Sequence, residues 1–224
     1  MSKDDWYRNE NWNADIEAAF RTKLARSRTS RPQYLSIQAG YLAERHPLVS
    51  LALIEEYFAT DDEFEVPTAL CTQAAAHLAL GNVSEAVAAY KRALELEEYQ
   101  PNYISTARLD LPTLVAGHRI AHEYHFALAI LADRFKASDL QFPSHRYYWN
   151  GANALIAYEI GNTVEARDFA ERALLAAAKT ESPFRYHRTI GLVGETEDDF
   201  GNRLKRIAKP SKLRSWLRVV SGKK

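Results

Sequence analysis

Three histidines, His118, His122 and His125, are the residues whose type and spacing come closest to a chemical site. Separations of four and three residues on one continuous helix would bring three imidazoles to one face, an arrangement that suits zinc. The helix pattern described below places a turn at His122, so we expect the three side chains to diverge. The segment HEYH, from His122 to His125, is also one residue shorter than the two-histidine motif of zinc peptidases. We therefore expect no metal site and no bound cofactor.

The other groups with catalytic potential have ordinary structural explanations. The single cysteine, Cys71, lies in an apolar segment, where a thiol is expected to pack rather than react. Acidic pairs such as Glu55-Glu56 are adjacent in sequence, so on a helix their carboxylates point in different directions. The chain contains no glycine-rich phosphate-binding loop. We predict that the protein is not an enzyme.

The composition is typical of a folded, soluble chain. Of the 224 residues, 46% are hydrophobic, which is enough for a buried core. The N-terminus lacks the basic and then apolar run of a secretory signal, and one cysteine cannot form an internal disulfide. No apolar stretch approaches the roughly 20 residues that span a bilayer. We expect a cytoplasmic location.

Charge is distributed unevenly along the chain. The formal net charge is zero, but residues 203–224 contain nine Lys or Arg and no acidic residue, so the remainder carries 20 basic and 29 acidic residues. The basic tail also has an apolar stripe at helical spacing. The tail residues that we expect to make contacts are Lys212, Arg214, Trp216, Leu217 and Arg218.

The hydrophobic residues recur with the period of a helix, and no segment alternates as a strand does, so the sequence predicts an all-α fold. An amphipathic helix is expected over 13–27. Helix pairs are expected over 32–45 with 48–59, 66–80 with 83–97, 106–121 with 124–135, and 143–160 with 163–178, followed by short helices over 195–208 and 212–220. Gly81 and Gly161 lie where helices should end. Prolines lie where first turns are expected, at Pro32, Pro67 and Pro143.

Two segments of the chain repeat one pattern. They are LALGNVSEAVAAYKRALELE (78–97) and YEIGNTVEARDFAERALLAA (158–177). Each contains a Gly-Asn turn, then Glu-Ala, an aromatic residue and an Ala-Leu pair at matching positions. An internal repeat of this length indicates stacked supersecondary units.

The repeated residues resemble the tetratricopeptide repeat (TPR) family. In 67–101 they are Leu70, Ala74, Gly81, Asn82, Ala86, Tyr90, Ala93 and Pro101, and in 147–178 they are Ala154, Gly161, Ala166, Phe169 or Ala170, and Ala173. The other two pairs match less well, and the third has His122 in place of the turn glycine. The resemblance implies a right-handed α-solenoid of about four hairpins over 32–178, with an N-terminal capping helix in 1–31 and a basic C-terminal extension over 179–224.

Membership of this family implies a non-catalytic scaffold or adaptor that binds another protein or peptide on the concave face of its first helices. Family geometry places Ser36, Gly40, Ala43, Cys71, Ala75, Leu78, Pro112, Ala116, Arg119, Gly151, Leu155 and Tyr158 there. Only Arg119 suits an acidic ligand, so an apolar or helical segment is the expected partner, the chain's own tail included. The residues expected to contact the partner are Cys71, Leu78, Arg119, Tyr148, Trp149, Leu155 and Tyr158.

The basic tail offers an alternative function. Its apolar stripe and surrounding cations suit attachment to an anionic membrane surface or to nucleic acid phosphates. Because the terminal repeats of a solenoid need covering, docking of the tail on the last helix or on a partner protein is favoured over both.

Overall fold

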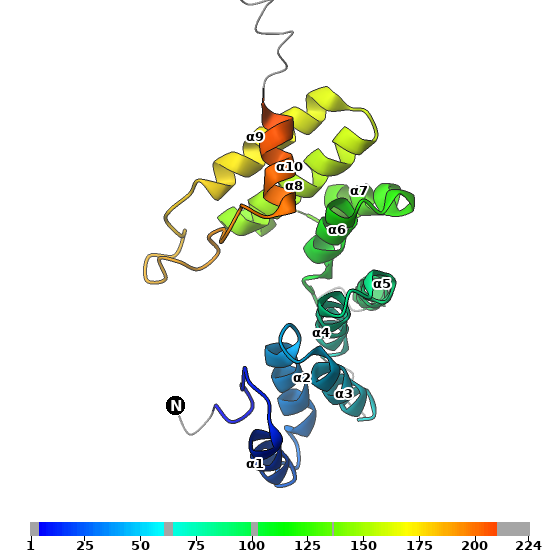
Figure 1. The fold of residues 1–224 in the computed structure, drawn as a ribbon, viewed down its shortest axis with the longest axis vertical. Coiled ribbons are helices and arrows are strands. Elements are labelled where there is room, and N and C mark those ends of the chain that lie inside the picture. The colour runs from blue at the N-terminus through cyan, green and yellow to red at the C-terminus, as the bar shows by residue number, and fades with distance from the viewer. Residues whose placement is uncertain (1–4, 61–64, 100–102, 136, 210–224) are drawn as a thin grey trace, which may run out of the picture. The chain divides into compact units, whose positions relative to one another are not determined.

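Helices form all the regular structure in the part of the chain that the structure describes, residues 5–60, 65–99, 103–135 and 137–209 (Figure 1). This computed structural model confirms the predicted all-α class. Within the described residues, no helix is both long and apolar enough to cross a bilayer. The chain divides into two compact units, unit 1 over 1–107 and unit 2 over 108–224. The division falls inside the span that the sequence predicts as one repeat domain.

The described residues of unit 1 form five helices. They are α1 (Ala14–Leu24), α2 (Arg31–Leu42), α3 (Pro47–Phe58), α4 (Val66–Ala79) and α5 (Val83–Tyr99). α2 packs on α3, α4 packs on α5, and α4 also contacts both α2 and α3. Proline occupies the first or second position of α2, α3 and α4, where its missing N–H costs no hydrogen bond.

The N-terminal segment of unit 1 is held by a buried polar contact as well as by aromatic packing. The Gln38 side chain is fully buried, accepts from the Asn9 backbone N–H at 3.1 Å, and donates to the Asn9 carbonyl at 2.8 Å. Trp6 and Trp12 place their rings 5.5 and 5.6 Å from the buried ring of Phe20. These contacts close the α1–α3 core against solvent.

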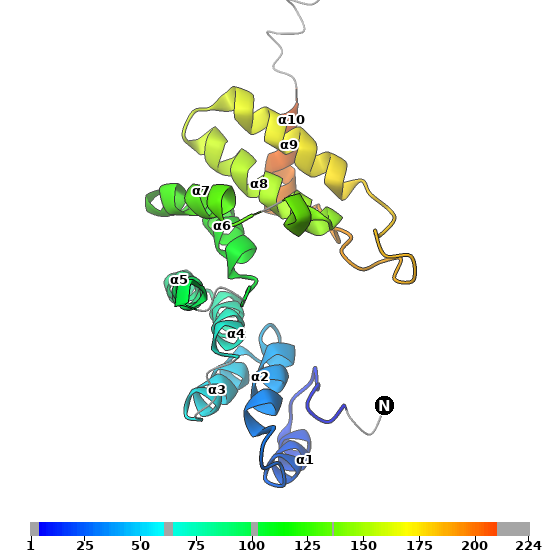
Figure 2. The same ribbon diagram turned by 180° about the vertical axis from the view of Figure 1, so that it is seen from behind.

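Unit 2 contains the remaining helices. They are α6 (Ala107–His118), η1 (Ala121–Glu123), α7 (Tyr124–Asp133), η2 (Ala137–Leu140), α8 (Pro143–Glu159), α9 (Thr163–Ala177) and α10 (Asp199–Ala208). α8 and α9 form an antiparallel hairpin, and α10 packs across both of them (Figures 1 and 2). The observed bounds of the helices agree with the predicted ones to within about four residues. The helix expected over 212–220 lies outside the described residues.

Three helix ends share one turn geometry. Gly81 and Gly161 have φ of 78° and 89°, and the following N–H groups, of Asn82 and Asn162, donate five residues back at 2.9 and 2.8 Å. The third turn has the same hydrogen bond, from Ile120 to the Val115 carbonyl at 3.0 Å, but its left-handed residue is Arg119, with φ of 55°. These turns satisfy carbonyls that the helix ends leave free.

The structure corrects the predicted place of the third turn. The sequence alignment put His122 at the glycine position, but α6 ends at His118 and Arg119 takes the left-handed conformation. His122 lies in η1, with its side chain 81% exposed, and His125 follows in α7. Among the described residues, no three metal-binding side chains form a group.

The small residues of the repeat pattern lie at helix–helix contacts. Side chains that are fully buried within the two hairpins are Ala74, Ala86 and Ala93 in α4–α5, and Ala154, Ala166, Ala170 and Ala173 in α8–α9. The aromatic Tyr90 is 4% exposed beside them. Small side chains let the paired helices approach closely, so these positions account for the conserved spacing of the two sequence segments.

Candidate functional site

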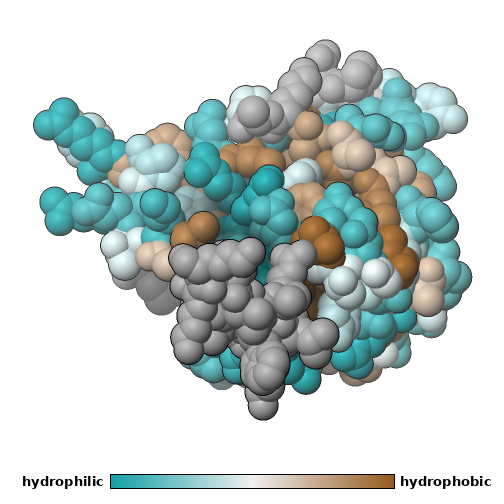
Figure 3. Space-filling view, turned by 90° about the horizontal axis from the view of Figure 1, so that it is seen from above, coloured by the Kyte–Doolittle hydropathy of each residue, from teal (hydrophilic) through white to brown (hydrophobic). Residues whose placement is uncertain are grey.

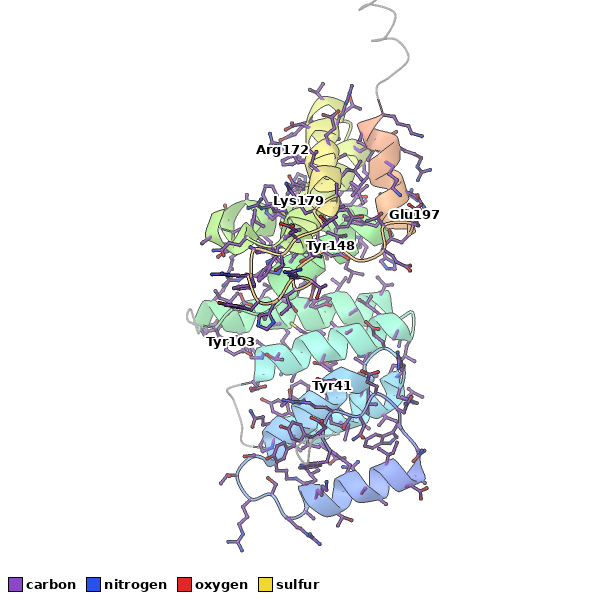
Figure 4. The ribbon with its side chains drawn as sticks, turned by 90° about the vertical axis from the view of Figure 1, so that its left-hand side faces the viewer. Tyr41, Tyr103, Tyr148, Arg172, Lys179 and Glu197 are labelled. Carbon is purple, nitrogen blue, oxygen red and sulfur yellow. The ribbon has the colours of Figure 1, made fainter. Side chains whose placement is uncertain are left out.

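A shallow groove lies on one face of unit 1, between α2 and α4. It encloses about 340 Å³ and is lined by Ser36, Ile37, Gly40, Tyr41, Glu65, Thr68 and Thr72. Figure 4 shows Tyr41 on α2, where its side chain is 44% exposed. Ser36 and Gly40 are among the residues that family geometry places on the concave face. The accessible surface of the groove is mostly apolar, and Glu65 is the one acidic residue in its lining.

Gly40 lines this groove at a position where no side chain occupies the space. A Cβ atom added at Gly40 would meet only Thr72 Oγ1, at 3.8 Å, which is an ordinary van der Waals distance. An alanine therefore fits at this position without displacing a neighbour. A longer side chain would extend into the groove and reduce its volume.

Neither of the two predicted contacts of α4 lines this groove. Cys71 and Leu78 are both half-buried on α4. Cys71 is adjacent in sequence to Thr72, which does line the groove. Leu78 lies six residues beyond Thr72, towards the end of α4.

In unit 2 the corresponding face of α8 is covered by α10. A Cβ atom added at Gly151 would lie 2.6 Å from Cε1 of Phe200 and 3.2 Å from Cδ1 of Leu204, so both side chains of α10 rest directly on the α8 backbone. Leu155 is fully buried. It has no surface to offer another molecule, which corrects its assignment as a partner contact.

The aromatic residues predicted as contacts at the edge of α8 pack partly against other residues of unit 2. Trp149 donates its indole N–H to the Leu131 carbonyl at 3.0 Å, and its ring lies 5.7 Å from that of Phe169. Tyr148, labelled in Figure 4, is 36% exposed and places its ring 5.9 Å from that of Phe200. Trp149 therefore acts mainly as a structural residue, and Tyr148 supports α10.

The remaining two predicted contacts, Arg119 and Tyr158, come together in a pocket of unit 2. This arginine pocket encloses about 200 Å³ and is lined by Arg119, Tyr158, Glu159, Arg203, Arg206 and Ile207. Tyr158 is 51% exposed. The residues come from the turn after α6, the end of α8, and α10, so the docked position of α10 forms the pocket.

Arg203 is the central group of this pocket. Its side chain is only 5% exposed. It donates to the carbonyls of Ala116 and Gly117, both at 3.0 Å, and to Glu159 Oε1 at 3.1 Å. The guanidinium thus satisfies free carbonyls at the end of α6 and pairs with the acid at the end of α8.

This arrangement of charges shifts the pKa values of two groups in unit 2, Arg203 and Tyr124. Arg119 Nε donates at 3.2 Å to the same Glu159 oxygen that Arg203 contacts. Burial lowers the pKa of Arg203 from its ordinary value, and the nearby charge of Arg119 lowers it further, whereas Glu159 and Asp199 act in the opposite direction. Burial also raises the pKa of Tyr124, and the Glu159 charge adds to that effect.

Sequence reasoning did not find Glu159, Arg203, Arg206 or Ile207. Arg203 and the Ala116 carbonyl are 87 residues apart in sequence, so no local pattern joins them. Gly151 in the middle of α8 is the one signal that something approaches that helix closely. The predicted tail contacts, Lys212, Arg214, Trp216, Leu217 and Arg218, lie outside the described residues.

Exposed apolar residues are scattered among polar ones on unit 2. At the α8–α9 turn, Ile160 and Val164 are 56% and 70% exposed. Figure 3 shows a face on which hydrophobic residues lie among hydrophilic ones. Single exposed apolar side chains of this kind are normal on protein surfaces, so they do not define a binding site.

Comparisons of the chain with protein-family models, with curated proteins and with solved structures found no match.

Proposed function

We propose that this protein is a non-catalytic adaptor, built from helical hairpins of the TPR type, that binds a short amphipathic helix of another protein. The proposed binding site is the groove between α2 and α4 in unit 1. On this reading α2, α4, α6 and α8 are the first helices of successive hairpins, and their exposed faces form the binding side. The buried alanines and the shared turn geometry support this reading.

The docked position of α10 on α8 carries the proposal. α10 places an aromatic residue, Phe200, directly over Gly151 on a first helix. Unit 1 has a glycine in the lining of the groove, Gly40 on α2, where an added Cβ atom would meet only Thr72 Oγ1, at 3.8 Å. A partner helix with an aromatic or large aliphatic residue would cover Gly40 as α10 covers Gly151.

The groove also indicates the charge of its partner. Glu65 lies in the lining, and the body of the chain outside 203–224 carries more acidic than basic residues. A partner helix with Lys or Arg beside its apolar residue would complement this charge. The basic tail of the chain has this composition around Trp216, so a segment of this kind exists within the chain itself.

Selection of peptides from a display library on the immobilised full-length chain tests the proposal. We expect enriched peptides to share an aromatic or large aliphatic residue with basic neighbours at helical spacing. Gly40→Leu is the blocking variant because its side chain enters the groove. Gly40→Ala is the matched control, since its Cβ atom meets only Thr72 Oγ1 at 3.8 Å.

Enriched peptides should bind the wild type and Gly40→Ala equally and should lose at least about tenfold in affinity on Gly40→Leu, equivalent to 1.4 kcal/mol. Equal binding to all three proteins would exclude the groove as the binding site. A synthetic peptide of residues 210–224, added to a chain that ends at Lys209, asks separately whether the tail itself is the occupant.

A further inference from the structure

We propose that the arginine pocket of unit 2 binds the phosphate group of a phosphate monoester. This goes beyond the proposed function, which concerns the groove in unit 1. The pocket is lined by three guanidinium groups and one carboxylate, so the formal charge of its lining is positive. Its walls also include the exposed ring of Tyr158 and the half-buried side chain of Ile207.

Arg203 and Arg119 share the one carboxylate of the pocket lining, that of Glu159. The Arg203 guanidinium bonds to the end carbonyls of α6 and to Glu159, and it is almost fully buried. Asp199 approaches Arg203 at 3.8 Å, but its side chain is 72% exposed and it does not line the pocket. The three guanidinium groups of the lining therefore outnumber its one carboxylate, and the pocket keeps an excess of positive charge.

Arg119 and Arg206 both carry N–H groups that have no hydrogen-bond partner among the described residues. Arg119 uses its Nε on Glu159, and the structure gives its two terminal nitrogens no partner within the described part of the chain. Arg206 is exposed on α10 and makes no hydrogen bond or ion pair with any described residue. Two guanidinium forks that line one hollow match the several oxygens and double charge of a phosphate monoester.

The turn after α6 presents one of these two guanidinium groups. Arg119 is the one residue other than glycine with a positive φ in the described residues, at 55°. A left-handed arginine costs about 1–2 kcal/mol relative to glycine, and the two equivalent turns of the chain do use glycine. The arginine at this position places a guanidinium in the pocket lining, where its Nε also donates to Glu159 at 3.2 Å.

An NMR titration tests the proposal. Inorganic phosphate is added to the full-length, 15N-labelled chain, and the signals of the arginine Nε–H groups are followed. We expect saturable shifts at Arg119 and Arg206, and much smaller shifts with acetate at the same ionic strength. O-phosphoserine, added in a second arm, asks whether an ester binds more tightly than the free ion. Arg206→Gln should weaken phosphate binding about tenfold, because a hydrogen bond to a charged group is lost.

Arg26→Gln in unit 1 is the matched control, because it removes the same charge from an exposed residue that does not line the pocket. This variant should bind phosphate as the wild type does. Equal shifts with acetate and phosphate, unchanged affinity in Arg206→Gln, or shifts confined to other arginines would each overturn the proposal. Loss of peptide binding to the groove would leave this result unaffected, so the two proposals fail separately.

Discussion

Gly151→Ala is the substitution whose effect the structure defines most sharply. Alanine favours the interior of a helix over glycine by about 1 kcal/mol, so a stabilising effect would be expected from α8 alone. The added Cβ atom, however, would lie 2.6 Å from Cε1 and 2.7 Å from Cζ of Phe200. Carbon atoms pack at about 3.5–4.0 Å, so the ring must move by roughly 1 Å.

The ring of Phe200 has little room for that movement. It is 8% exposed and lies 5.8 Å from the ring of Tyr147 and 5.9 Å from that of Tyr148. Overpacking of this kind costs about 1–3 kcal/mol. After the gain in helix propensity is subtracted, we expect Gly151→Ala to lower the free energy of unfolding by about 1 kcal/mol.

Gly40→Ala supplies the control, because it makes the same replacement in the last turn of α2 without a clash. It should raise the free energy of unfolding by up to about 1 kcal/mol. Urea unfolding of both variants measures these values, and hydrogen exchange should show faster exchange in α10 for Gly151→Ala alone. Equal stabilisation by both substitutions, with unchanged protection of α10, would refute the packing of Phe200 on Gly151.

Three further substitutions test other contacts. Arg119→Gly should be more stable than Arg119→Ala by about 1 kcal/mol in thermal or urea unfolding, the reverse of the usual order, because only glycine relieves the left-handed turn. Gln38→Ala should cost about 1–3 kcal/mol and should speed tryptic cleavage after Arg8, because the hydrogen bonds to Asn9 are lost. Arg203→Met should cost about 3 kcal/mol and should lower the hydrogen-exchange protection of α10, because it leaves buried carbonyls without a donor. Unchanged stability or unchanged cleavage in any of these would contradict the corresponding contact.

The sequence predicted most helix positions because local chemistry decides them. Proline at first turns and Gly81 and Gly161 at helix ends mark boundaries that depend only on neighbouring residues. The third turn was misplaced because Arg119 adopts a conformation in which a search for turn signals expects glycine. A rule based on residue type misses a turn that the rest of the fold imposes.

The parts of the candidate site that sequence did not predict depend on contacts between distant segments. Arg203 contacts Glu159 across 44 residues and Gly117 across 86. The periodicity of a helix shows which face is apolar but does not show what covers that face. Leu155 was therefore assigned to an open surface, whereas it is fully buried.

The most direct test of the account is an NMR map of a selected peptide on the full-length chain. Backbone amide shifts should concentrate on the groove residues of unit 1, including Gly40, Thr68 and Thr72, and should vanish in Gly40→Leu but persist in Gly40→Ala. Shifts that fall instead on α8 and α10, or that persist in Gly40→Leu, would contradict the claim that the α2–α4 face binds the partner.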